Sequence, residues 1–256
     1  IGGKSPNGFV QIYDYQKNSI NVFDYGLTEI KKIITVDSIA IASFIDGQDI
    51  GLIKWIYSDN EWSYRDIFRN FPILIGSING IEIINRKIYL GTDTGLWVGD
   101  ITENLKNPNS WVLVSNEYSG SIDAMRAIEN GFAFISNQNI YTAIFLDDTY
   151  QYERLEIQIP VAFTEFLFDE DNFLWGFYNK KVYSQRNNFN PISTGKILYD
   201  ISINHLGNII IGSELGIIEI NIDSFEQKNH VPNSPATGKF SAIKVLQDGR
   251  HSWCQF

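Results

Sequence analysis

The chain of 256 residues is long enough for two ordinary domains or for one large all-β domain. With 44% hydrophobic and 14% aromatic residues, it has ample material for a buried core and is not a disordered sequence. The formal charge of -10 argues against a nucleic-acid partner, because phosphate binding needs a basic face.

In chain order, short alternating segments rich in Ile, Val, Phe and Tyr are separated by Gly, Asn and Asp, which predicts strands and tight turns rather than helices. Residues 8–25 predict two strands, Phe9–Tyr13 and Ile20–Phe23, as the outer half of a blade whose inner strands are absent. Complete four-stranded units are then predicted at residues 29–67, 80–115, 121–156, 162–193 and 199–228. Residues 241–256 open a further unit without completing it.

The clearest repeat is Lys87–Asp100, which reads as a strand, a tight turn at residues 93–95 and a second strand. We interpret its Gly91 and Gly95 as turn glycines, and they align with Gly212 and Gly216, a separation of 212 - 91 = 121 residues. Degenerate copies centred on Ile135 and Gly176 divide this distance into steps of 44, 41 and 36 residues, an average of about 40. That spacing is typical of one four-stranded propeller blade.

We therefore predict an all-β fold, a β-propeller of four-stranded antiparallel blades that has seven blades in the full protein. This chain should hold about five complete blades, with partial blades at both ends. Packing the sheets radially buries both faces of each one. We expect one domain over residues 1–256, truncated at both ends because the chain starts at Ile1 without Met and stops within a predicted strand.

The stretch Asn204–Gly216 resembles the two-component-regulator propeller repeat, which has a polar turn, an apolar-Trp-apolar-Gly-Thr strand, and a second Gly after a short turn. Ile210 replaces the Trp in this copy. Asp169–Gly176 fits the first half of the pattern and lacks the second Gly. The resemblance implies a propeller that is found, among other places, in extracytoplasmic sensing domains of signalling receptors.

The layout is also similar to the amino-terminal propeller of PorZ-like proteins of the type IX secretion system. The similarity is carried by Ile12–Phe23, by Gly91–Val98 followed by Leu105–Trp111, and by Pro232–Ala236 ahead of a new repeat. It implies an exported, non-enzymatic protein with further domains, placed in the periplasm or at the bacterial cell surface. Such a protein handles protein cargo or glycan, here at the propeller mouth.

Few residues are candidates for chemistry. The three histidines, His205, His230 and His251, are too far apart for a metal motif. Asp169–Asn172 could offer oxygens to calcium but lacks the Gly and the distal Glu of an EF-hand loop, so we interpret it as a turn. Asp147-Asp148 is interpreted as a hairpin tip. Cys254 is the only cysteine, which excludes an intramolecular disulfide.

Other candidates are interpreted in the same way. Ser58–Trp62 resembles the Asp-box turn of sialidase-like propellers without the Gly-x-Thr that completes it. We expect Trp97 and Trp175 to pack in the core, whereas Trp62 and Trp111 could also stack on sugars. We therefore predict no catalytic residue, no metal and no cofactor, and the sequence leaves the ligand-binding residues unassigned.

Three functions remain open at this point. The first is a non-catalytic, exported binding or scaffold propeller of the PorZ-like kind. The second is the extracytoplasmic sensing propeller of a two-component receptor. The third is a glycan-acting propeller enzyme, which would need convergent carboxylates with perturbed pKa values in a central pocket. No run of about 18 apolar residues predicts a membrane span within this segment.

Overall fold

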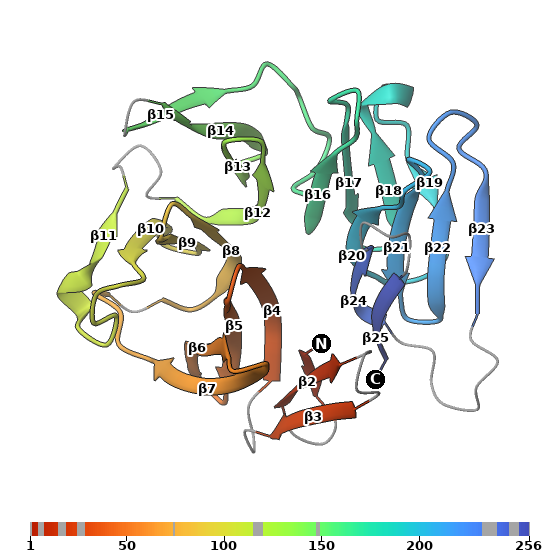
Figure 1. Ribbon diagram of the computed structural model, residues 1–256. Coiled ribbons are helices and arrows are strands. Elements are labelled where there is room, and N and C mark those ends of the chain that lie inside the picture. Colours follow the sequence, from red (N-terminus) through yellow and green to blue (C-terminus); the bar gives the residue numbers. More distant parts are fainter. Residues whose placement is uncertain are drawn as a thin grey trace. The chain divides into compact units, whose positions relative to one another are not determined.

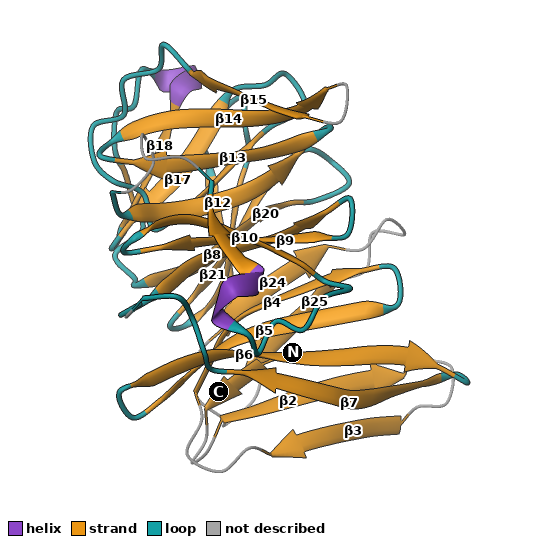
Figure 2. Ribbon diagram, turned by 90° about the vertical axis from the view of Figure 1, so that its left-hand side faces the viewer, coloured by secondary structure: helices purple, strands orange, loops and turns teal. Residues whose placement is uncertain are grey.

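The computed structural model describes residues 2–4, 8–14, 19–24, 29–73, 75–114, 120–146, 149–231, 240–245 and 251–255. The described residues are nearly all in strands and turns, and they include five four-stranded antiparallel sheets in a β-propeller arrangement (Figure 1). The helices among them are single 3-10 turns, Pro108–Ser110 and Gln185–Asn187 (Figure 2). The chain divides into two compact units, residues 1–158 and 159–256, which are taken separately below.

Three complete blades belong to the first unit, and each runs in sequence order from its first to its fourth strand. The strands of the first blade are β4 (Glu29–Val36), β5 (Ile39–Asp46), β6 (Asp49–Ser58) and β7 (Glu61–Phe68). The second blade contains β8 (Ile78–Ile84), β9 (Lys87–Thr92), β10 (Gly95–Asp100) and β11 (Trp111–Leu113). The third contains β12 (Ile122–Ile128), β13 (Gly131–Ser136), β14 (Asn139–Leu146) and β15 (Thr149–Arg154).

Two complete blades belong to the second unit. One contains β16 (Glu165–Phe168), β17 (Leu174–Tyr178), β18 (Lys181–Ser184) and β19 (Ile192–Ser193). The other contains β20 (Leu198–Ile203), β21 (Ile209–Ser213), β22 (Gly216–Ile220) and β23 (Gln227–His230). The five blades lie where the sequence predicts them, which confirms the all-β propeller and its blade boundaries to within a few residues.

Smaller sheets stand at both ends of the described chain. The predicted hairpin near the amino end is present as β2 (Gly8–Asp14) and β3 (Ser19–Asp24). A further strand, β1 (Gly2–Lys4), pairs with β2, so the prediction that only an outer pair of strands is present was wrong. At the other end β24 (Phe240–Val245) and β25 (His251–Gln255) form a two-stranded sheet, as expected for a blade that begins there.

Two-residue turns connect many of the paired strands. Asn85 and Arg86 between β8 and β9 both have positive φ, as do Asn137 and Gln138 between β13 and β14. Such turns twist in the same sense as the strands they join, and Asn tolerates their left-handed conformation well. The polar dipeptides between apolar segments therefore fix the register of each hairpin.

The core lies between the faces of successive blades. In the first unit, Ile41 and Leu52 from one blade belong to the same buried cluster as Ile81 and Leu90 from the next. In the second unit, a cluster containing Trp175 and Ile211 joins the blades of β16–β19 and β20–β23. Each sheet is buried on faces that it could not cover alone, which explains why the apolar alternation recurs in every blade.

In the repeated Gly-Thr or Gly-Ser pair at the end of a second strand, the hydroxyl residue closes the turn that follows. Thr92 is fully buried, and its hydroxyl donates to the carbonyl of Gly95 over 2.8 Å, which closes the β9–β10 turn. Ser213 makes the same 2.8 Å bond to Gly216 between β21 and β22. Gly95 itself has φ 123, a conformation that favours glycine.

Gly91 is not a turn residue, so its interpretation as turn geometry was wrong. It lies within β9 next to the following blade, and a Cβ atom there would come within 2.7 Å of Ile122 Cγ2 on β12. Gly91 is paired with Gly80 on β8, where a Cβ atom would come within 2.3 Å of Met125 Cβ. The paired glycines give β12 room to pack closely against this blade.

The proposed equivalence of Gly176 and Gly91 also needs correction. Counted back from the two-residue turn that follows each second strand, Gly91 corresponds to Gly212 and to Phe177. Gly176 is one position earlier and therefore points to the opposite face of its sheet. A Cβ atom at Gly176 would come within 2.2 Å of the Phe163 ring, so this glycine makes room for an aromatic side chain.

Candidate functional site

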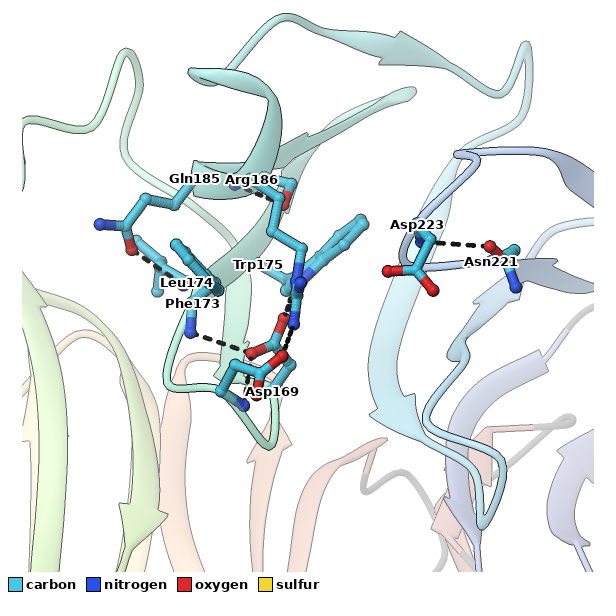
Figure 3. A network of polar contacts seen from close by, with 10 residues as sticks. Asp169, Phe173, Leu174, Trp175, Gln185, Arg186, Asn221 and Asp223 are labelled. Atoms are coloured by element: carbon cyan, nitrogen blue, oxygen red, sulfur yellow. Dashed lines mark hydrogen bonds and ion pairs between the residues drawn. The ribbon is translucent and has the colours of Figure 1, made fainter.

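Asp169, the first residue of the candidate calcium loop, is the centre of a hydrogen-bond network inside its own blade (Figure 3). Its carboxylate accepts bonds from the Phe173 amide at 2.9 Å and from the Trp175 indole at 2.9 Å. Arg186 Nε donates to the same carboxylate at 2.6 Å, and its guanidinium lies 4.7 Å from the centre of the Phe173 ring. The network links the β16–β17 turn to the segment that follows β18.

The charge on Asp169 is stabilised from within the protein. Burial alone would raise the pKa of this carboxyl, but the hydrogen bonds from Arg186, Trp175 and the Phe173 amide outweigh it and hold the pKa below its ordinary value. The hydrogen bonds to Asp169 and Asp171 likewise raise the pKa of Arg186. With its carboxylate fully buried and engaged by these donors, Asp169 serves as a structural anchor, and the prediction of a turn is confirmed.

Asn204 occupies the same place in the next blade. Its side-chain oxygen accepts from the amides of Leu206 and Asn208 at 2.9 Å, as Asp169 accepts from Asp171 and Phe173. Nearby, Glu219 accepts from Asn208 at 2.9 Å and pairs with His230 at 2.9 Å. His230 therefore contacts a carboxylate on its own sheet, and no group of three metal-binding side chains occurs among the described residues.

The other segments that the sequence analysis interpreted as turns are Ser58–Trp62 and Asp147-Asp148. Asp59 and Asn60 form the β6–β7 turn with positive φ at both residues, so Ser58–Trp62 is a hairpin connection. Asp147-Asp148 and the side chains of His251 and Cys254 lie outside the described residues.

Three of the four tryptophans considered in the sequence analysis are buried. Trp97 and Trp175 are buried, which confirms their assignment to the core. Trp111 on an outer strand is buried as well, and its indole donates to the Leu105 carbonyl at 3.0 Å. Trp62 is half-buried against Tyr57, with ring centres 5.3 Å apart.

A feature that the sequence reasoning missed lies on the first strand of several blades. One extra residue interrupts the pairing of β4, β8, β12 and β20 with its second strand. These β-bulge residues are Lys31, Asn79, Asp123 and Tyr199. Bulges turn a side chain away from its regular position in the ladder and are common beside binding sites. Each of these four blades therefore offers one polar side chain near the start of its first strand.

The bulges recur at related positions. On β8, β12 and β20 the bulge faces the last two residues of the second strand, which are Gly91-Thr92 in the blade of β8 and Gly212-Ser213 in that of β20. On β4 it lies two residues further along the strand. The apolar residues that flank each bulge are three apart, as in Ile78 and Ile81, instead of two. This spacing is the signal in the sequence that could have revealed them.

In the first unit, the bulge residues of β8 and β12 come from strands that pack against each other. Asn79 Nδ2 on β8 donates to the Ile122 carbonyl over 2.8 Å, immediately before the bulge at Asp123. Lys31, on β4, pairs with Glu29 of the same strand at 2.8 Å. We use the name inner-strand row for Lys31, Asn79 and Asp123, which supply an ammonium, an amide and a carboxyl group.

Asp123 is the least satisfied member of the inner-strand row. The carboxyl is half-buried, and within the described part of the chain its only hydrogen bond comes from the Ser121 hydroxyl at a long 3.3 Å. Burial raises the pKa of Asp123, and the bond from Ser121 only partly offsets this effect. A half-buried carboxyl with spare acceptor capacity at a bulge is a candidate for contact with a ligand.

A hollow of about 640 Å³ lies at the same end of the first unit's blades, over the β5–β6 turn and the β7–β8 connection. Its lining includes Arg69 and the apolar side chains of Phe71 and Ile73. Arg69 is already engaged, with bonds to Asp46 at 2.9 Å and a position 4.8 Å from the Phe44 ring centre. The hollow therefore offers both polar and apolar surface beside the start of β8.

Comparisons with known proteins bear on the fold. No protein-family model and no curated protein sequence matches the chain. Among solved structures, it resembles the extracellular domain of BT4673, a Bacteroides thetaiotaomicron protein assigned to a one-component system, with a TM-score of 0.63 and 9% identity over 100% of this chain and 36% of that one. The chain also resembles the extracellular domain of BT3049, which is assigned to a hybrid two-component system of the same organism. Here the TM-score is 0.55 and the sequence identity is 12%, over 88% of this chain and 32% of that one.

A third similar structure is YCF48 bound to a D1 peptide, with a TM-score of 0.63 and 12% identity over 99% of this chain and 83% of that chain. At these identities the likeness establishes the β-propeller fold. The chain spans about a third of the length of the BT4673 and BT3049 domains. None of the helices in the described residues is long and apolar enough to cross a membrane.

Proposed function

We propose that this chain is part of an extracytoplasmic sensing propeller that binds a polar ligand through the first strands of its blades. The observation that carries the proposal is the inner-strand row, above all the half-buried carboxyl of Asp123, which has a single long hydrogen bond among the described residues. A repeated bulge that presents Lys31, Asn79 and Asp123 costs regular pairing on the first strands of three successive blades, and a binding role explains why the cost is borne.

The structural neighbours support the sensing interpretation better than a role in type IX secretion. The domains of BT4673 and BT3049 are extracellular parts of signalling proteins, which agrees with the resemblance of Asn204–Gly216 to the two-component-regulator repeat. The PorZ-like function rests on short motifs alone. An enzymatic role would need converging carboxylates, whereas the inner-strand row has one carboxyl group that is short of hydrogen bonds.

The chemistry of the row favours a neutral ligand rich in hydroxyl or amide groups. An ammonium group donates, a carboxylate accepts and an amide does both, so together they can satisfy several ligand hydroxyls. Since the row carries one positive and one negative charge, it does not select strongly for either sign. Neutral oligosaccharides and short peptides both meet this description, and they form the two arms of the test.

The test is a calorimetric binding screen of neutral oligosaccharides and short peptides against the wild-type chain and matched variants. Asp123→Asn and Asn79→Ala should each weaken binding about tenfold, as expected for the loss of a hydrogen bond in a desolvated site. Asp223→Asn, a change of the same kind at an exposed residue, is the control and should bind normally. A ligand whose affinity is equal in all four proteins would refute the inner-strand site.

A further inference from the structure

A second, smaller cavity lies at the opposite ends of β4 and β8 from the bulges. Its volume is about 280 Å³, and it is bounded by Val36 at the end of β4, by Ile83 near the end of β8 and by Ile101 after β10. These residues provide an apolar wall. The charged residues at the cavity are Asp37, Lys54 and Arg86.

Lys54 is the notable group in this cavity. It is half-buried on β6, and within the described ranges its ammonium donates one hydrogen bond, to the Ile101 carbonyl at a long 3.3 Å. It forms no ion pair among the described residues, and Asp66, the nearby acid, is held by Lys106 at 2.6 Å. An ammonium group has three donors, so two of them remain available to a molecule in the cavity.

The environment of Lys54 disfavours an isolated charge. Burial lowers the pKa of the ammonium, as does the nearby Arg65, while Asp66 acts in the opposite direction without cancelling them. A half-buried cation without a carboxylate partner is unfavourable, and an anionic ligand would relieve that cost. The observation therefore points to an anion as the missing partner.

Arg86 supplies a second positive charge. It stands in the exposed β8–β9 turn at the rim of the cavity, and its side chain has no hydrogen bond or ion pair within the part of the chain that the structure describes. Asp37 is the one acidic residue of the lining, so the lining side chains carry a net charge of +1, whereas the whole chain carries -10. Outside the lining, Asp100 binds the hydroxyl of Thr102 and lies near Arg86 and Lys87. The positive cavity therefore stands out from its acidic surroundings.

We propose that this cavity binds a small monocarboxylate with a short apolar body. The carboxylate accepts hydrogen bonds from Lys54 and Arg86, and the apolar body lies against Val36, Ile83 and Ile101. The volume suits a ligand of few atoms rather than a polymer chain. The inference is independent of the inner-strand row, which lies at the other ends of the same strands.

Titration calorimetry with isovalerate, its neutral isostere isovaleramide, and valine tests the proposal on the whole chain. Isovalerate should bind and isovaleramide should not. Lys54→Met and Arg86→Gln should each weaken isovalerate binding at least tenfold, since a charge-assisted hydrogen bond is lost. The control is Lys87→Gln, which removes a positive charge next to Arg86 but outside the cavity lining and should change the affinity less than twofold.

The variant Asp37→Asn distinguishes the two kinds of ligand that could supply the carboxylate, a free carboxylic acid and an α-amino acid. For a free carboxylic acid, removal of this negative charge should strengthen binding. For an α-amino acid such as valine, Asp37 would hold the ammonium group, so the same variant should weaken binding. The proposal is overturned if isovalerate does not bind at millimolar concentration, if isovaleramide binds as well as isovalerate, or if folded Lys54→Met and Arg86→Gln both bind as the wild type does.

Discussion

Arg186 Nε donates to the buried carboxylate of Asp169 over 2.6 Å, and this bond joins two segments of one blade that are 17 residues apart. The acidic cluster that looks most like a metal loop in the sequence is thus engaged by the protein's own donors. Asp123, in contrast, stands in an ordinary sequence context and has one weak hydrogen bond within the part of the chain that the structure describes. The number of hydrogen bonds that a carboxylate accepts therefore distinguishes the structural site at Asp169 from the candidate functional site at Asp123.

Replacing Arg186 by Met should destabilise the protein by about 3 kcal/mol, because it leaves the buried Asp169 carboxylate without its ionic partner. The double variant with Asp169→Asn should recover part of this loss, since no charge then remains buried. Chemical denaturation measures both values. Asp171→Asn removes the more exposed carboxylate that contacts Arg186 and should cost well under 1 kcal/mol. Equal stabilities of wild type and Arg186→Met would contradict the anchor role.

Acid should unfold the protein in part through Asp169. The pKa of this carboxyl in the folded state lies below its ordinary value near 3.8, so its stabilising contribution is complete above that value and is lost as the pH falls through the folded pKa. The free energy of unfolding should therefore fall more steeply below about pH 4 for the wild type than for Asp169→Asn. Denaturation curves at pH 7, 4 and 3 compare the two slopes, and parallel slopes would show that Asp169 is not responsible.

Asp123→Asn should leave stability unchanged or raise it by up to about 1 kcal/mol at pH 7, because it removes a half-buried charge with few partners. Protonation of Asp123 should also stabilise the protein. Because the pKa of Asp123 is raised in the folded state, the free energy of unfolding should increase as the pH falls through that pKa. Thermal unfolding at pH 7 and pH 5 checks both points. A loss of more than about 2 kcal/mol would mark Asp123 as structural instead, the usual result of breaking a buried network.

Gly91→Ala should destabilise the first unit by about 1–3 kcal/mol, because its Cβ atom would overlap Ile122 Cγ2 from the neighbouring blade. The penalty should be smaller in an Ile122→Ala background, where that methyl group is absent and the nearest remaining atom of residue 122 is its Cβ at 3.2 Å. A double-mutant cycle gives the coupling energy directly. Additive effects of the two substitutions would show that the blades do not approach as closely as the structure has them.

Much of the fold is predictable because each blade repeats the same local chemistry. Thr92 and Ser213 close equivalent turns with their hydroxyl groups, so the Gly-Thr and Gly-Ser pairs mark the end of a second strand reliably. Gly176 misleads the alignment by one residue, because a glycine that makes room for Phe163 looks the same in sequence as one that makes room for a neighbouring strand. Composition does not reveal which face of a strand a glycine serves.

The candidate site is harder to predict, because it depends on single-residue bulges. The three-residue spacing between Ile122 and Met125 is ordinary on its own and becomes informative only when Ile78 and Ile81 repeat it in the preceding blade. The weak bonding of Asp123 depends on contacts across strands, which no local pattern encodes. The cavity at Lys54 likewise forms between two blades and has no signature in either one.

Hydrogen–deuterium exchange with and without a ligand from the oligosaccharide and peptide screen measures directly whether the first strands of the blades bind the ligand. Binding at the inner-strand row should slow exchange in peptides that contain residues 29–32, 78–80 and 121–124, with no change around Asp169 and Arg186. Protection confined to the Asp169 turn or to the outer strands, with the inner-strand row unaffected, would contradict it.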